Sequence, residues 1–182
     1  IGAVMFYFQG CSVWDVTKVT VPMLLAATLI LQGLRLFIPI PPQVSMFVIG
    51  SLVNACLVLA VWSVGRKSGL VVACVTPVFA WLEGMLPFLP FIFPVAAGNC
   101  AFVFAVDGLR RFRAAGLAGA ALCKAAVVYG SFYVLFSYVE FPAAVRHMIL
   151  LVMSWPQIVT AAAGGVLAYV IAKRLPRLEG PR

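Results

Sequence analysis

The sequence contains runs of apolar residues that are too long and too free of charge for a soluble domain. Residues 36–65 and 68–82 include no Asp, Glu, Lys or Arg. Hydrophobic residues make up 64% of the chain and charged residues 10%, whereas a soluble domain has roughly 25% charged residues. A soluble core of 182 residues cannot absorb that much apolar surface. The sequence therefore predicts an all-α integral membrane protein, since the runs also lack the alternation of barrel strands.

Six segments have about the 20 residues that a helix needs to cross a bilayer core of roughly 30 Å. We expect these spans at residues 19–38, 44–65, 69–86, 92–109, 116–139 and 146–172. Of the 13 Lys and Arg residues, ten fall on one side, Arg35 and Arg146 fall on the other, and Lys124 lies within a span. The positive-inside rule then predicts a six-helix bundle with both termini in the cytoplasm.

The two ends of the chain are expected to lie outside this bundle. The predicted membrane domain covers residues 17–175, and residues 176–182 form a basic cytoplasmic tail. Residues 1–16 form an N-terminal segment in which residues 7–10, YFQG, match the end of a common protease-cleavage tag. We assign no function to that segment.

Several classes of function lack their sequence signatures. The net charge of +8 falls mostly in short clusters between apolar runs, where it sets topology and does not indicate a nucleic-acid partner. The five cysteines have no metal-ligand spacing. There is no HExxH, GxSxG or GxGxxG motif and no nucleotide-binding loop. We therefore expect no enzyme, no cofactor and no metal site, and an active pump would need its ATPase on another chain.

A helical hairpin at residues 76–107 carries two polar side chains inside apolar sequence. Glu83 lies near the outer end of the third span and Asn99 near the start of the fourth, on either side of a proline-rich turn. Polar residues in spans are costly and usually face a bundle interior or a cavity. Glu83 could equally reach water at the interface, and Asn99 or Asn54 could form an interhelical hydrogen bond without any ligand.

The fifth and sixth spans add further candidates. Lys124 can either face the bundle or extend its ammonium group towards the headgroups, and we turn it inward because a lysine facing lipid is costly. Pro156 predicts a kink in the sixth span. Ser154 and Gln157 share one side of an ideal helix, with Trp155 opposite. Gln157 is therefore the better cavity candidate, and Trp155 reaches the cavity only if the kink rotates it.

Taken together, these features resemble the substrate-binding S component of an energy-coupling factor (ECF) transporter. The resemblance covers about residues 17–175 and rests on the six short spans with both ends inside. It also rests on GSLVNA (50–55), TPVFAWLEG (76–84) before a proline-rich outer loop, GN (98–99) and SWPQ (154–157). The family usually carries an AxxxA signature in its first span for docking onto the coupling protein. Here only Ala26 and Ala27 are present, with Ile30 and Leu31 where a second alanine would fall.

The resemblance implies a multi-pass protein of the bacterial or archaeal cytoplasmic membrane that captures a small vitamin or related micronutrient at the outer face. It implies a lid made by the loops after the first and third spans, and three partner chains, namely a transmembrane coupling protein and two ATPase subunits. A non-transporting membrane scaffold of the morphogenesis type is the alternative. The expected cavity is bounded by Glu83, Asn99, Lys124 and Gln157, with Asn54, Ser154 and Trp155 as further substrate contacts and Ala26 and Ala27 as docking residues.

Overall fold

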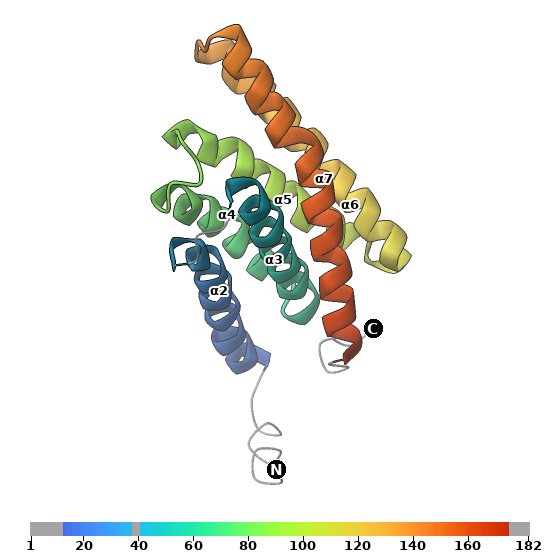
Figure 1. The fold of residues 1–182 in the computed structure, drawn as a ribbon. Coiled ribbons are helices and arrows are strands. Elements are labelled where there is room, and N and C mark those ends of the chain that lie inside the picture. The colour runs from blue at the N-terminus through green and yellow to red at the C-terminus, as the bar shows by residue number, and fades with distance from the viewer. Residues whose placement is uncertain (1–12, 38–40, 175–182) are drawn as a thin grey trace.

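The computed structural model describes residues 13–37 and 41–174, and in these ranges it contains helices and no strands. The α-helices are α2 (Val13–Phe37), α3 (Pro42–Ser63), α4 (Arg66–Leu82), α5 (Ile92–Gly108), α6 (Arg113–Tyr138) and α7 (Ala143–Arg174) (Figure 1). Short 3-10 turns at Leu89–Phe91 and Arg110–Phe112 precede α5 and α6. The prediction of an all-helical chain is confirmed for these residues.

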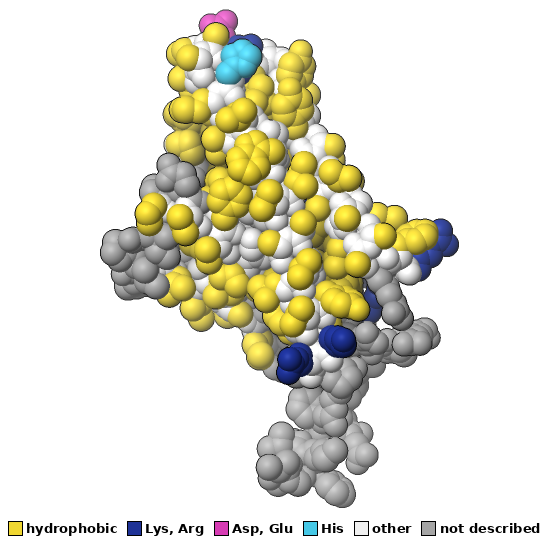
Figure 2. Space-filling view, turned by 45° about the vertical axis from the view of Figure 1, so that its right-hand side comes forward, with side chains coloured by type: hydrophobic (Ala, Val, Ile, Leu, Met, Phe, Trp, Pro, Cys, Tyr) yellow, Lys and Arg dark blue, Asp and Glu magenta, His cyan; other side chains and the backbone are white. Residues whose placement is uncertain are grey.

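Four of the described helical segments are long and apolar enough to cross a membrane, namely Val44–Ser63, Leu89–Gly108, Ala114–Tyr138 and Ala143–Arg174. The apolar part of α2, Thr20–Leu34, is shorter, and α4 has 17 residues and begins with two charged ones. Hydrophobic side chains cover the face drawn in Figure 2 between a basic end and an end that carries the histidine. The chain is thus a multi-pass membrane protein by the length and composition of its helices.

The helices form one bundle in which α3 packs against α7, α6 against α5 and α7, and α4 against α5. Helix α2 lies at the edge and contacts α3 and α4 (Figure 1). The first described turn of α2 and the last turn of α7 lie at the same end of the bundle, whereas the α6–α7 connection extends beyond the other helices at the opposite end.

Two buried apolar clusters divide the interior along the helix axes. The main cluster contains residues such as Leu57, Val72 and Phe102. The aromatic cluster consists of Leu86, Phe91, Val128, Phe132 and Phe136, and the Phe91 and Phe132 rings lie 5.0 Å apart edge to face. Between the two clusters each helix from α3 to α7 contributes a buried polar residue: Asn54, Thr76, Asn99, Lys124 and Thr160. These residues form a polar layer, which is the place to look for a site.

Helix α4 ends four residues earlier than the sequence predicted. The N–H of Gly84 bonds to the Trp81 carbonyl at 3.0 Å, and the N–H of Met85 bonds to the Ala80 carbonyl at 2.8 Å. Gly84 has a φ of 73°, so the two bonds form a Schellman motif that only a glycine accommodates easily. Glu83 becomes the C-cap residue and leaves the helical path.

Candidate ligand-binding cavity

A cavity of about 280 Å³ occupies the polar layer between α2, α3, α4, α5, α6 and α7. Four of the side chains that the sequence proposed as substrate contacts line it together: Asn54, Asn99, Lys124 and Gln157. Asn54, Asn99 and Lys124 are each at most 3% exposed. Four segments that are far apart in the sequence therefore converge on one cavity within an apolar bundle. As substrate contacts these residues remain a prediction.

Lys124 is held on the wall by a chain of hydrogen bonds that joins three helices. Its Nζ donates to Asn54 Oδ1 at 2.6 Å, and Asn54 Nδ2 donates to Thr160 Oγ1 at 3.4 Å. Thr160 in turn donates to the Gln157 carbonyl at 3.3 Å. The ring of Phe102 lies below the ammonium, with 5.5 Å between Nζ and the ring centroid. Lys124 therefore faces the bundle and does not extend towards a membrane surface.

A second polar group, around Thr76, lines another part of the wall. Asn99 Nδ2 lies 3.4 Å from both the Ala73 carbonyl and Thr76 Oγ1. Gln32 of α2, which is 3% exposed, donates from Nε2 to the Thr76 carbonyl at 3.2 Å. Sequence reasoning missed Gln32, although Thr28 and Gln32 are polar residues at i and i+4 in an apolar helix and both are buried.

Two prolines inside helices also lie on the cavity wall, Pro77 in α4 and Pro156 in α7. A proline cannot donate to the carbonyl four residues earlier, which is that of Ala73 for Pro77 and that of Val152 for Pro156. Asn99 supplies the missing donor to Ala73. Helix α7 continues through Pro156 as a single helix. Backbone irregularity inside a membrane is tolerated where it lines a cavity.

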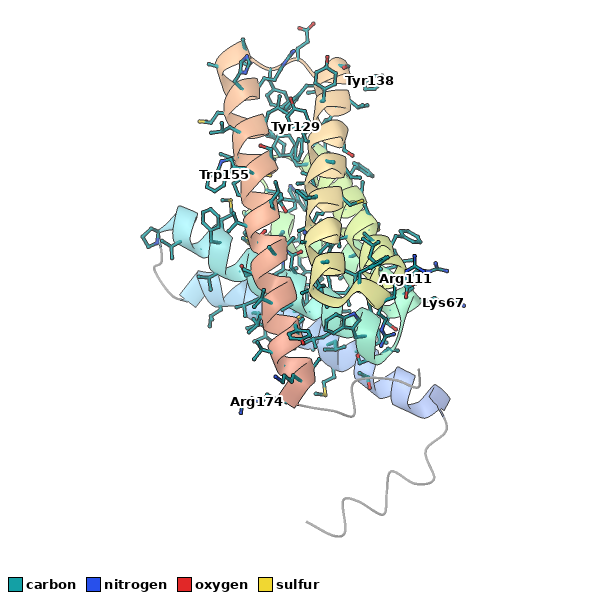
Figure 3. The ribbon with its side chains drawn as sticks, turned by 90° about the vertical axis from the view of Figure 1, so that its right-hand side faces the viewer. Lys67, Arg111, Tyr129, Tyr138, Trp155 and Arg174 are labelled. Carbon is teal, nitrogen blue, oxygen red and sulfur yellow. The ribbon has the colours of Figure 1, made fainter. Side chains whose placement is uncertain are left out.

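Three of the predicted substrate contacts lie outside this cavity. Glu83, half-buried at the end of α4, approaches Gly33 of α2. Ser154 donates to the Leu151 carbonyl at 3.2 Å. Trp155 is 51% exposed on the outer side of α7 and packs on Phe47, with 5.7 Å between ring centroids (Figure 3).

The expected lid lies only partly within the described residues. Residues 38–40 of the loop after α2 fall outside them. In the loop after α4, Met85 and Leu86 line the cavity, and Leu86 joins the aromatic cluster. The proline-rich loop therefore contributes a wall of the cavity directly through its first residues.

A second cavity of about 560 Å³ lies between the projecting ends of α6 and α7. Its wall contains Tyr129, Tyr133, Phe136, Ser137, Arg146, His147, Leu150, Leu151 and Ser154. The Arg146 guanidinium lies 6.0 Å from the centroid of the Phe136 ring. This cavity is larger, but its polar side chains are mostly exposed, unlike the buried set around Lys124.

The residues expected to dock a partner lie on the exposed face of α2. Ala26 and Ala27 are exposed beside Met23 and Ile30, which are 69% and 71% exposed. At the start of α6, Gly116 packs against the Leu109 carbonyl and Ala120 is fully buried, whereas Ala114, Ala115 and Ala118 are exposed. Ala26 and Ala27 of α2 are thus open to a neighbour.

No group of three or more His, Cys, Asp or Glu side chains that could hold a metal ion occurs in the described part of the chain. Comparison with known proteins finds no family model, curated protein or solved structure that matches this chain.

Proposed function

We propose that this chain is the substrate-binding S component of an ECF-type transporter, which captures a small vitamin-like micronutrient for ATP-driven uptake by partner subunits. The observation that carries the proposal is the convergence of Asn54, Asn99, Lys124 and Gln157 on one cavity. Keeping several polar side chains inside a membrane bundle is costly and is typical of a binding site or transport pathway. A scaffold needs no such cavity, because interhelical hydrogen bonds alone would hold its helices.

The proposal includes six membrane passes with both termini in the cytoplasm. Lys67, Arg111 and Arg174 lie towards one end of the bundle and Tyr138 at the other (Figure 3). This distribution fits the positive-inside rule if the basic end faces the cytoplasm. The shorter helices α2 and α4 then complete the six passes together with the four long ones.

Cysteine labelling tests this orientation. In a variant whose native cysteines are replaced by alanine, we expect a membrane-impermeant thiol reagent to label Arg111→Cys only from the cytoplasmic side. Pro90→Cys should be labelled only from outside, because Pro90 lies in the loop between α4 and α5. Labelling of both positions from one side would contradict the six-pass arrangement.

Purification from native membranes tests the proposed function. We expect the tagged chain, extracted in mild detergent, to carry a coupling protein and two ATPase subunits and to show ATP hydrolysis only in that assembly. The isolated chain should retain a small molecule in native mass spectrometry and hydrolyse no ATP. Recovery of cell-wall synthesis proteins without an ATPase would favour the scaffold.

The exposed face of α2 is the proposed docking surface, since small residues let helices approach closely. We expect Ala26→Leu combined with Ala27→Leu to abolish assembly with the coupling protein and to leave ligand retention unchanged, because neither residue lines the cavity. The matched control is Ala126→Leu with Ala163→Leu, which places the same bulk on exposed positions of α6 and α7. Normal assembly of the α2 variant, or equal loss in the control, would exclude this surface.

A further inference from the structure

Lys124 has an unusual environment for a buried lysine. Its side chain is 3% exposed, and none of the described carboxylates lies within 4 Å of Nζ. The ion pair that the described residues form, Arg66 with Asp107 at 3.8 Å, lies at the surface. A buried ammonium without a counter-charge is strongly destabilised. The hydrogen bond to the Asn54 amide and the Phe102 ring compensate for only part of that cost.

Lys124 also has N–H donors that its hydrogen bond to Asn54 does not use. An ammonium group has three N–H donors, and the hydrogen bond to Asn54 uses one of them. Since Lys124 lines the cavity, the remaining donors are available to a molecule inside it. An anionic group there would supply the missing counter-charge and accept a charge-assisted hydrogen bond.

Gln32 gives an independent indication of the ligand's other end. Its Oε1 is buried and has no hydrogen-bond partner among the described residues, while its Nε2 is occupied by the Thr76 carbonyl. Gln32 lines the same cavity from α2, whereas Lys124 lines it from α6. A buried acceptor without a donor costs about 1–3 kcal/mol, which a ligand N–H or O–H would recover.

The remaining wall limits the size and charge of the ligand. It is mainly apolar, with side chains such as Ile49, Val53, Val95 and Met153. The volume of about 280 Å³ is at or below the lower end of the roughly 300–1,000 Å³ of small-molecule pockets. A single buried cation balances a single negative charge, and a second charge would remain uncompensated.

We propose, on the basis of the proposed function, that the ligand is a small organic monocarboxylate with an apolar body. Its carboxylate pairs with Lys124 Nζ, and an N–H or O–H group of the ligand donates to Gln32 Oε1. The structure thereby assigns Lys124 as the residue that selects the charge of the ligand and, together with Gln32, fixes the orientation of the ligand in the cavity.

Binding of matched acids and amides tests this assignment. The probes are small aromatic and aliphatic carboxylates that carry an N–H or O–H donor, each beside its neutral primary amide, including indole-3-acetate with indole-3-acetamide and 4-hydroxybenzoate with 4-hydroxybenzamide. Affinity is measured by thermal shift on the purified full chain. We expect at least one acid to bind about tenfold or more tightly than its amide, and Lys124→Met to reduce that preference to within about twofold.

Arg146→Met is the matched control, because it removes an exposed cation from the other cavity. It should leave the preference for the acid unchanged. Loss of the preference in this variant would overturn the proposal, because it would place the anion in the second cavity, between the projecting ends of α6 and α7. A second variant, Gln32→Leu, should weaken the preferred acid about fivefold or more. If no acid binds better than its amide while amides bind, the proposed binding function stands and the charge assignment fails. If neither acids nor amides bind, the monocarboxylate assignment fails, and the proposed binding function is decided by whether the isolated chain retains a small molecule in native mass spectrometry.

Discussion

Gly164→Ala is expected to destabilise the protein more than any other single-methyl addition in α7. A Cβ atom at this position would lie 2.5 Å from the Ser51 carbonyl oxygen, 2.6 Å from Asn54 Cβ and 2.8 Å from the Ala55 nitrogen. Two of these atoms belong to the α3 backbone and cannot rotate away, so α3 and α7 must move apart. Overpacking of this kind costs about 1–3 kcal/mol, or a melting temperature lower by roughly 2–12 °C for a chain of this size.

Gly130→Ala is the matched control on α6. A Cβ atom at Gly130 meets no atom within 4 Å, and alanine is more favourable than glycine in a helix interior by up to about 1 kcal/mol. The control should therefore melt at or slightly above the wild-type temperature in the same detergent. A Gly164→Ala protein that melts with the wild type would show that α3 and α7 do not approach this closely.

The inward placement of Lys124 could be argued from the sequence by the cost of turning its side chain towards lipid. The sequence places Lys124 within an apolar run, where a lysine facing lipid is costly. Asn54, Asn99 and Gln157 follow from the same argument, and the structure places all four around one cavity. Nothing in the sequence alone could show that Asn54 Oδ1 accepts the hydrogen bond from Lys124, because the two residues are 70 positions apart.

Glu83 shows where the phase of an ideal helix no longer predicts the position of a side chain. It lies seven residues after Thr76, so an ideal continuous helix would place both on the face that lines the cavity. The positive φ of Gly84 ends the helix at Leu82 and redirects the chain. The glycine was visible in the sequence, but its left-handed conformation depends on the loop packing against the aromatic cluster through Leu86 and Phe91. The sequence also did not indicate that Gln32 lines the cavity, because α2 packs at the edge of the bundle.

Truncating the cavity side chains is expected to have the largest effect on binding. Asn99→Ala and Gln157→Ala each remove a polar group from the cavity wall, and loss of a hydrogen bond that leaves a buried ligand atom unpaired costs about 1–3 kcal/mol. The small molecule that co-purifies with the chain should therefore bind roughly 5- to 150-fold more weakly, as measured by titration. Lys124→Ala should lie at the upper end of that range, because hydrogen bonds to charged groups are the stronger ones.

Two of the three predicted contacts that lie outside the cavity provide the contrast. Ser154→Ala removes only a hydroxyl that bonds within α7, and Trp155→Ala removes an exposed ring from the outer side of the same helix. Both variants should bind the co-purified molecule within about twofold of wild type, since an exposed side chain away from a ligand has little effect. Melting temperatures must be compared first, because Asn99→Ala also leaves the Ala73 carbonyl without its donor. If correctly folded Asn99, Lys124 and Gln157 variants retain wild-type affinity while Trp155→Ala loses it, the ligand binds on the outer side of α7, and the buried polar side chains serve to hold the helices together.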